Sequence, residues 1–348
     1  MQSVAGVMAK RRITSYDVAR AAGVSQTTVS FVLNEVKGAS ISDETRQRVL
    51  AVAEELGYVP DAAAQALGRG RTHIIGVVVT TLADPFIGTI VQIIESAAHE
   101  QGYTVILASS NDISEREIEA VRMLQSRRVD GVIVTSSRVG ALYQERLEQL
   151  NVPVVLINSL VQHNGRYTFS IGVDNRHGGW LAAGHLIQRG HRRIAYVASP
   201  ADRGDNMERM AGYRDALREG GIEFDSSLVV QGTGRAGCGQ RALHALLSLN
   251  DPPSAAFCYN DMTAIGLMDA ARGAGLSLPQ DLAIVGFDDI AFAQLSHPRL
   301  TTIAQPMAEL GEGAVEMVLQ LLTDDVEAEM PVTDVTVQGR LVVRASSA

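Results

Sequence analysis

From Ile74 onward the sequence alternates short apolar runs with longer amphipathic stretches, and this alternation restricts the possible fold more than any other feature. The apolar runs have the length and β-branched character of buried strands: IIGVVVT, YTVILASS, DGVIVTSS, VPVVLINS, RIAYVASP, SAAFCYN and LAIVGFDD. Helical stretches such as IGTIVQIIESAAHEQG and HGGWLAAGHLIQRG lie between them. Repeated strand–helix units predict parallel sheets covered by helices on both faces. We therefore expect an α/β core of two doubly wound subdomains, with ligand sites at the carboxyl ends of the strands.

The first 58 residues have a different pattern, which predicts three short helices. Thr14, Ser25 and Ser42 are expected as N-caps, and Gly23 and Gly57 as the ends of the first and third helices. The first two helices are joined by a tight turn that contains a glycine, which is typical of a helix-turn-helix. A plain three-helix bundle with an incidental polar face is the alternative.

The second of these helices, SQTTVSFVLN, has an unusual outer face. Its apolar residues recur at i, i+3 and i+4 from Val29, which places one stripe against a core. The opposite side carries Thr27, Phe31 and Asn34 instead of the Lys and Glu of an ordinary solvated face. Small polar side chains at the start of such a helix fit the edges of bases in the major groove. The sequence therefore predicts a helix that reads DNA.

Charge is distributed unevenly along the chain of 348 residues, which exceeds one ordinary domain. The net charge is −9, but the first 70 residues hold eight Lys and Arg against seven acids, so their net charge is +1 and the other 278 residues carry −10. An acidic body is repelled by nucleic acid, so DNA contacts are expected from the first segment alone. We predict a DNA-binding domain over 1–58, a hinge segment with a conditional helix over 59–72 and a core over 73–348.

Other classes of protein have little support in the sequence. No apolar run is long enough to span a membrane, and the basic cluster near the N-terminus follows its short apolar stretch, so we expect a cytoplasmic protein that does not contact the membrane. The buried-type run around Cys258 makes this cysteine a small hydrophobe rather than a nucleophile. GTGRAG, from Gly232 to Gly237, matches a dinucleotide-binding pattern after only a short apolar run, and a loop before a helix is the simpler interpretation. We predict no cofactor, no metal and no catalytic residue.

A series of segments, in order and spacing, resembles the LacI/GalR family of transcriptional regulators over nearly the whole chain. They are SYDVARAAGVSQTTVSFVLN, SDETRQRV, LGYVPDAAAQALGRGRTHIIGV, DPF, GVDNRHGGWLAAGHLIQRGHRRIAYV, ERMAGYRDAL, YNDMTAIG, LAIVGFDDI and LTTIAQPMAELG. The resemblance implies a homodimer whose heads bind a palindromic operator, and a core similar to periplasmic sugar-binding proteins that holds a small effector. It implies subdomain one at about 73–171 and 301–332, and subdomain two at about 173–300 and 333–348.

Carried over residue by residue, the resemblance implies DNA contacts for Tyr16, Ser25, Gln26, Thr27, Thr28, Phe31, Asn34, Ala64 and Leu67. Tyr16 matches a tyrosine that contacts phosphate, and Leu67 matches a leucine that is inserted into the minor groove and kinks the DNA. Phe31 stands where several relatives have Arg, so it offers an apolar contact, for example to a thymine methyl. Its alternative role is to cap the helical bundle.

For the effector pocket the resemblance implies Phe86, Asn158, Arg209, Asn260 and Asp288. Asn, Arg and Asp together satisfy the hydroxyls of a carbohydrate or a related metabolite. Three of these polar residues also have a structural alternative: Asn260 and Asp288 as helix caps, and Arg209 as a surface ion pair. Asp174 is expected to cap the helix that follows it.

The sequence departs from the family where some relatives place an aromatic residue that stacks on the ligand. Gly234 and Arg235 occupy that stretch, which favours an anionic ligand such as a sugar acid or phosphate over a flat base or a stacked hexose. The chain ends at LVVRASSA without the leucine-repeat tail of tetrameric relatives, so a dimer is expected. A ligand-responsive repressor explains all these features. A solute-binding protein leaves the DNA-reading helix unexplained, and an enzyme is supported by GTGRAG alone.

Overall fold

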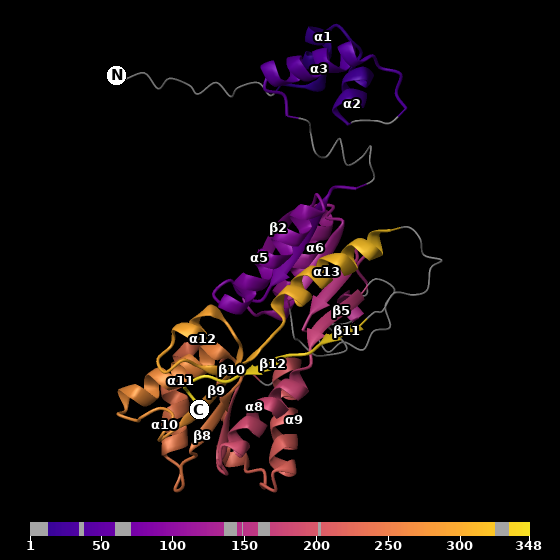
Figure 1. Ribbon diagram of the computed structural model, residues 1–348. Coiled ribbons are helices and arrows are strands. Elements are labelled where there is room, and N and C mark those ends of the chain that lie inside the picture. Colours follow the sequence, from indigo (N-terminus) through magenta and orange to yellow (C-terminus); the bar gives the residue numbers. More distant parts are fainter. Residues whose placement is uncertain are drawn as a thin grey trace, which may run out of the picture. The chain divides into compact units, whose positions relative to one another are not determined.

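The computed structural model describes residues 13–34, 38–59, 71–135, 145–147, 149–158, 168–200, 203–323 and 334–348. The chain forms two compact units, Met1–Thr72 and His73–Ala348, which we call the head and the core (Figure 1). Residues 60–70 of the predicted hinge segment lie outside the described residues.

The described part of the head contains three helices: α1 (Ser15–Ala22), α2 (Gln26–Leu33) and α3 (Asp43–Glu55). The predicted caps are confirmed, because the side chains of Thr14, Ser25 and Ser42 each accept a hydrogen bond from a backbone N–H of the first turn. Asp17 completes a capping box with Thr14. Gly23 ends α1 in the left-handed conformation, with a φ of 66° that glycine adopts without strain.

The head has its own small apolar core, to which all three helices contribute. Val29 and Val32 of α2 are buried in it, and Leu33 is partly buried against it. Thr27 and Phe31 are exposed on the other side of α2. The amphipathic pattern read from the sequence is therefore confirmed for this helix.

The core contains two six-stranded sheets within its described residues. The first sheet defines subdomain one, and its strands lie in the order β11 (Asp334–Val337), β5 (Thr168–Val173), β4 (Val154–Ile157), β3 (Gly131–Thr135), β1 (Ile74–Val79) and β2 (Thr104–Ser109). All its strand pairs are parallel. Parallel strands buried on both faces explain why runs such as IIGVVV are apolar throughout rather than alternating.

Helices cover both faces of the first sheet (Figure 1). On one face, α5 (Pro85–Glu100) and α13 (Met307–Leu322) pack with Val77 and Val79. On the other face, α6 (Ser114–Ser126) packs with Val78. Successive residues of one strand therefore belong to different apolar clusters, as the two-residue period of a strand requires.

The second sheet defines subdomain two. Its order is β12 (Arg340–Val342), β10 (Thr301–Ala304), β9 (Ala283–Asp288), β8 (Ala255–Cys258), β6 (Ile194–Ala198) and β7 (Val229–Gln231). Only the β10–β12 pair is antiparallel among these described strands. One face is covered by α8 (Asn175–Gln188) and α9 (Gly204–Glu219), and the other by α10 (Gly239–Leu247), α11 (Asp261–Gly273) and α12 (Ala291–Leu295). The predicted class, a helix-turn-helix domain followed in the chain by two doubly wound α/β subdomains, is confirmed.

The subdomain boundaries predicted for the last third of the chain are wrong. β10, expected in subdomain one, pairs with β9 in the second sheet, and β11, expected in subdomain two, pairs with β5 in the first sheet. The chain therefore crosses after β10 and crosses back between β11 and β12. The physical reason is that a short strand joins the sheet whose edge offers free hydrogen-bonding groups, and the order of segments along the chain does not reveal that edge.

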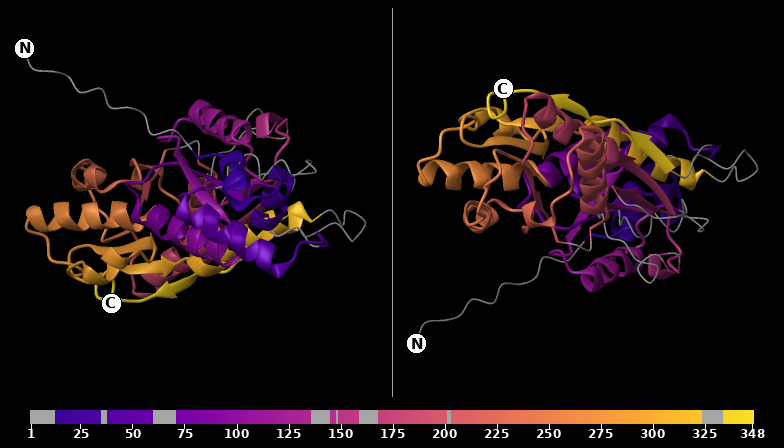
Figure 2. Two further views of the ribbon diagram at one scale, coloured as in Figure 1. Left: turned by 90° about the horizontal axis from the view of Figure 1, so that it is seen from above. Right: turned by 90° about the horizontal axis from the view of Figure 1, so that it is seen from below.

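The C-terminal residues are part of subdomain two (Figure 1 and Figure 2). Ser346 and Ser347 are buried, and the Ser346 hydroxyl donates to the carbonyl of Ile284 at 2.6 Å. The Ser347 hydroxyl lies 2.8 Å from Nε2 of the buried His185. The last residues of the chain are thus hydrogen-bonded to β9 and to the start of β10.

Candidate functional site

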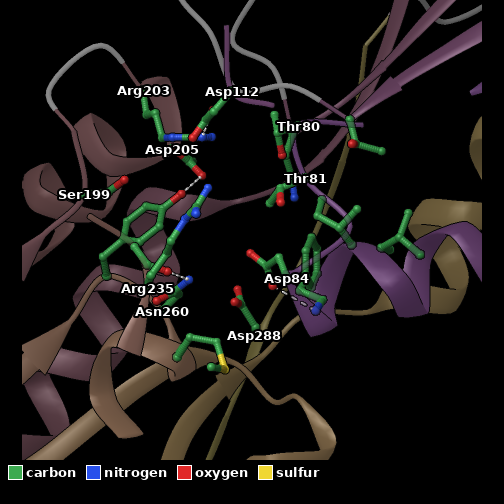
Figure 3. A pocket seen from close by; sticks show the side chains of 18 of the residues that line it. Thr80, Thr81, Asp84, Asp112, Ser199, Arg203, Asp205, Arg235, Asn260 and Asp288 are labelled. Carbon is green, nitrogen blue, oxygen red and sulfur yellow. Dashed lines mark hydrogen bonds and ion pairs between the residues drawn. The ribbon is translucent and has the colours of Figure 1, made fainter. Parts of the chain in front are cut away.

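A pocket of about 180 Å³ lies between the two subdomains, at the carboxyl ends of β1, β3, β4, β8 and β9 (Figure 3). Every effector residue predicted from the sequence lines it: Phe86, Asn158, Arg209, Asn260 and Asp288. The position agrees with the rule that open α/β sheets hold ligands at the carboxyl ends of their strands.

Subdomain one contributes an apolar wall and, at the start of α5, the acid Asp84. Phe86 is buried and packs in the cluster that includes Ile90 of α5. Asp84 is the N-cap of α5, and its Oδ1 accepts from the backbone N–H of Phe86 at 3.0 Å. Burial raises the pKa of Asp84, although the positive charges of Arg203, Arg209 and Arg235 oppose that rise. This carboxyl group is therefore placed at the pocket by the start of a helix.

Arg209 is the central cation of the pocket, and it is not the surface ion pair that was the alternative. It is only 2% exposed, and its Nε and Nη1 donate to Oδ1 of Asn175 at 2.8 Å and to the carbonyl of Tyr259 at 2.6 Å. Its guanidinium lies 3.9 Å from the carboxylates of both Asp205 and Asp288. A buried arginine needs such partners, because an unpaired buried charge is very costly.

Aromatic rings and a second acid hold this arginine in place. The guanidinium carbon lies 3.6 Å from the ring centroid of Phe287 and 4.7 Å from that of Tyr259. The Tyr259 hydroxyl donates to Oδ2 of Asp205 at 2.5 Å. Burial raises the pKa of the Tyr259 hydroxyl well above its ordinary value, so this group remains a donor.

A chain of amide hydrogen bonds links the two subdomains through Gln305. Asn158 Nδ2 donates to Gln305 Oε1 at 3.1 Å, and Gln305 Nε2 donates to Asp288 Oδ1 at 2.7 Å. Gln305 follows β10, at the point where the chain crosses to α13. Sequence reasoning missed Gln305, because a single glutamine after a short strand has no pattern of its own.

Two of these residues hold backbone conformations that amino acids with side chains rarely adopt. Asn158 has a φ of 60° and Asp288 a φ of 119°. Strain of this kind collects at functional sites, where the surrounding structure maintains it. Burial raises the pKa of Asp288 well above its ordinary value, and Arg209 lowers it in part.

Asn260 and Asp288 both had a helix cap as their alternative role, and only Asn260 takes that role. Asn260 does cap α11, since its Oδ1 accepts from Thr263 N at 2.9 Å, and it also lines the pocket. Asp288 caps no helix, because the N-cap of α12 is Ile290. Asp174 caps α8 as predicted, accepting from His177 N at 2.8 Å. Local capping and a place in the pocket are thus compatible for Asn260.

An ion pair across the cleft was also missed from the sequence. Arg203, at the N-cap of α9 in subdomain two, donates to Asp112 in the loop between β2 and α6 of subdomain one. Asn111 and Asp112 both have positive φ, 51° and 66°, and this turn directs the carboxylate toward the cleft. The ND pair before a helix was visible in the sequence, but its partner lies 91 residues away.

The DNA-reading residues predicted in the head lie at the start of α2 and beside it. Tyr16 is 61% exposed, and the guanidinium carbon of Arg20 lies 5.5 Å from the centroid of its ring. The hydroxyls of Ser25 and Thr28 lie 2.9 Å apart, and Ser25 caps the helix. Gln26 donates to the Ser15 hydroxyl at 2.8 Å, so α1 holds its side chain.

The outer face of α2 keeps its unusual character in the structure. Phe31 is 39% exposed and lies outside the apolar cluster of the head, so it does not cap the bundle. Asn34 ends the helix, is half-buried and donates to the Ser30 hydroxyl at 3.2 Å. The other two predicted DNA contacts, Ala64 and Leu67, lie outside the described residues.

Among the described residues no group of His, Cys, Asp or Glu is arranged to hold a metal ion. Cys238 and Cys258 are both buried. In the same part of the chain, no helix combines the length and the apolar character needed to cross a membrane.

A helix-turn-helix head, followed in the chain by a core whose two subdomains enclose a pocket, defines a DNA-binding regulator with a ligand-binding core. Comparison with known proteins agrees: residues 14–61 match the bacterial regulatory proteins of the lacI family, and residues 183–347 match the periplasmic binding protein-like domain. The chain belongs to the LacI family of transcriptional repressors.

Curated relatives and solved structures support this membership. The HTH-type transcriptional repressor PurR of Vibrio atlanticus is 34% identical over 313 residues, covering 89% of this chain and 92% of the relative. The lac repressor dimer bound to operator and the anti-inducer ONPF is 30% identical, with a TM-score of 0.86, covering 97% and 99% of the two chains. The regulator CelR in complex with cellobiose is 31% identical, with a TM-score of 0.71, covering 96% and 100%.

Proposed function

We propose that this protein is a ligand-gated repressor that acts in the cytoplasm as a homodimer on a palindromic operator, and that a small carbohydrate or carbohydrate derivative in the pocket controls its DNA affinity. The observation that carries the proposal is the pocket, because Phe86 and Asn158 come from one subdomain and Arg209 and Asp288 from the other. A ligand held by both walls binds one relative position of the subdomains better than another, and this differential affinity is what shifts a conformational equilibrium.

The chemistry of the lining favours a ligand with several hydroxyl groups. Asp84, Asp288 and Asn158 present carboxylate and amide oxygens that accept from hydroxyls, while Arg209 and Asn260 donate. Among similar structures, CelR is in complex with cellobiose. A periplasmic binding protein/LacI transcriptional regulator from Alkaliphilus metalliredigens, which is 26% identical to this chain with a TM-score of 0.69, is in complex with D-xylulofuranose. We therefore assign Phe86, Asn158, Arg209, Asn260 and Asp288 to the effector.

The operator is expected to be read by α2 together with the segment after α3. We assign base contacts to Gln26, Thr27 and Phe31, and phosphate or backbone contacts to Tyr16, Ser25, Thr28 and Asn34. Ala64 and Leu67 complete the surface, with Leu67 inserted into the minor groove at the centre of a palindromic site. Heads from two copies would then occupy two half-sites about one helical turn apart, or a multiple of it.

The homodimer is supported by the edge of the first sheet. β2 is an edge strand, and unlike the fully buried β3 it exposes the apolar side chains Ile106 and Leu107. Ile113 and Met123, on the α6 side, are exposed as well. An uncovered apolar edge of this kind favours contact with another chain.

Leu107→Arg is expected to shift the protein from dimer to monomer and to weaken operator binding, because a charge in an apolar interface must be desolvated. Sedimentation velocity at several protein concentrations measures the shift. Val343→Arg is the control, since this exposed valine lies beyond β12 at the edge of the other sheet. If both variants sediment as the wild type, the dimer forms through another surface.

The function itself is tested with genomic fragments. The full-length protein should retard specific fragments in a mobility-shift assay, and one class of carbohydrate should change the midpoint of that retardation. A ligand at about 100 times its Kd adds about 2.7 kcal/mol of stability, so a thermal-shift screen identifies it first. Ligand binding without any retained fragment would instead indicate a solute-binding protein.

Phe31→Ala is expected to weaken binding to the operator by about 1–3 kcal/mol, the scale of one base-specific contact. Its affinity for random DNA and the salt dependence of that affinity should stay unchanged, because Phe31 carries no charge. Fluorescence anisotropy with both DNAs at several salt concentrations measures this. Equal losses on the two DNAs would remove Phe31 from the base-reading surface.

A further inference from the structure

Three arginines line the effector pocket, and they differ in their partners. Arg203 is paired with Asp112, and Arg209 lies 3.9 Å from Asp205 and Asp288. For Arg235, the described residues provide no carboxylate at ion-pair distance. The positive charge of Arg235 is felt at Asp84, whose pKa it lowers in opposition to the effect of burial. Arg235 is therefore the lining cation whose guanidinium is open to a ligand.

The backbone that carries Arg235 is held firmly at the edge of the pocket. The Arg235 carbonyl accepts from the backbone N–H of Cys238 at 3.2 Å and from its thiol at 3.0 Å. The neighbouring Gly234 carbonyl accepts from Nδ2 of the buried Asn260 at 3.0 Å, which ties the loop to the start of α11. Figure 3 shows Arg235 beside Asn260, with Asp84 on the opposite side of the pocket.

The residue before Arg235 leaves room for a ligand group. Gly234 has a φ of 70°, and a Cβ at this position would lie 3.4 Å from Cε1 of Tyr259. A side chain there would be strained and would cover the ring of Tyr259 on the side of the loop. Glycine therefore leaves this part of the pocket lining, directly before Arg235, without a side chain.

The carboxylates that line the pocket do not neutralise the charge of Arg235 by direct contact. Asp112 is bound to Arg203, and Asp205 to the Tyr259 hydroxyl. Asp84 accepts from the backbone N–H of Phe86 at 3.0 Å, and Asp288 accepts from Nε2 of Gln305 at 2.7 Å. Burial raises the pKa of both carboxyl groups. A ligand that carries one negative charge therefore finds a cation without an ion-pair partner at one end and hydrogen-bonded acids elsewhere.

We infer that the effector is an acidic carbohydrate, and that Arg235 binds its carboxylate or phosphate group. This inference rests on the carbohydrate effector proposed above and narrows its class. The planar guanidinium offers two parallel N–H donors to either group. The hydroxyls of the same ligand reach Asp84, Asp288 and Asn260.

The test compares each neutral sugar with its own acids. Glucose, galactose, mannose and ribose are screened by thermal shift against their aldonic acids and their terminal phosphates, at constant ionic strength, with acetate and inorganic phosphate as anion controls. Titration calorimetry then gives affinities for the sugars that bind. Comparison of the aldonic acids with the sugar phosphates identifies which acidic group the pocket binds.

One acidic sugar is expected to bind the wild type at least about 10-fold more tightly than its neutral parent. Arg235→Ala should weaken the acid by about 10- to 100-fold and change the affinity for the neutral parent by less than about 2-fold. Arg241→Ala is the matched control: this exposed arginine lies on α10 outside the pocket, and its variant should bind as the wild type.

Two results would overturn the inference while leaving the carbohydrate effector intact. Neutral sugars could bind as tightly as their acids in the wild type and in Arg235→Ala, or Arg235→Ala and Arg241→Ala could weaken the acids equally through general electrostatics. If neither neutral nor acidic sugars bind, the carbohydrate effector itself is wrong, and the inference fails with it.

Discussion

Arg209→Ala is expected to abolish the effector response and to lower the free energy of unfolding of the core by about 3–5 kcal/mol, the cost of breaking a buried ion pair from one side. The variant leaves Asp205 and Asp288 buried without the cation that lies 3.9 Å from each. It also removes the hydrogen bonds that reach Asn175 and the Tyr259 carbonyl. Urea unfolding measures the stability loss, and titration of operator binding with the effector measures the response.

The stability loss should depend on pH. Arg209 lowers the pKa of Asp288, so its removal raises that pKa further above the value in the unfolded chain. A carboxyl group with a raised folded pKa favours folding at low pH, and this contribution is lost as the pH rises from the unfolded toward the folded pKa. The deficit of Arg209→Ala should therefore be smaller at about pH 5 than at about pH 7.

Arg218→Ala provides the control on the same helix. The Arg218 side chain is 73% exposed and pairs with Asp215 at 2.7 Å. Exposed pairs contribute at most about 1 kcal/mol, so this variant should unfold and respond to ligand nearly as the wild type. If Arg209→Ala and Arg218→Ala were equally stable at neutral pH, the buried contacts of Arg209 with Asp205 and Asp288 would not stabilise the core as their geometry indicates.

Gly179→Ala is expected to lower the stability of the core by about 1–3 kcal/mol and to weaken effector binding at the same time. A Cβ on Gly179 would lie 2.2 Å from the carbonyl oxygen of Arg209, so α8 and α9 must separate to accept it. That separation displaces the backbone of the arginine that lines the pocket. The loss should appear both in urea unfolding and in the affinity for the effector.

Gly184→Ala, on the same helix, should have the opposite effect. A Cβ at Gly184 meets nothing within 4 Å. Glycine in a helix costs about 1 kcal/mol relative to alanine, so the variant should be slightly more stable and should bind the effector normally. Equal behaviour of the two variants would mean that α8 and α9 tolerate a wider spacing than their contact indicates.

The sequence alone was sufficient for features whose cause is local. Caps such as Thr14, Ser25 and Asp174 act within one helical turn, so their residue types and spacing identify them. The central strands were recognised because burial on both faces requires an apolar residue at every position, as in β1 and β3. The order of strand–helix units then determined the fold class.

The short and marginal strands were not recognisable in the same way. β5, TFSIGV, is interrupted by Ser170 and Gly172, and β10, TTIA, begins with two threonines. Their sheet membership depends on hydrogen bonds to strands far away in the chain, such as β9 for β10. No local pattern encodes such a partner, so the boundaries near residues 301 and 333 were misplaced.

The pocket residues also fall into two groups, those with a local signal in the sequence and those without one. Asn158, Asn260 and Asp288 were implied as lining residues by the family resemblance, and each lies at or just after the end of an apolar strand, where strand ends meet at one edge of a sheet. The Arg203–Asp112 pair across the cleft and the link from Asn158 through Gln305 to Asp288 could not be predicted. These contacts join residues 91 and 147 positions apart, and only the tertiary packing of the two subdomains brings them together. Periodicity and capping report the surroundings of a residue within a few positions, whereas a partner across a cleft is decided by how the whole chain folds.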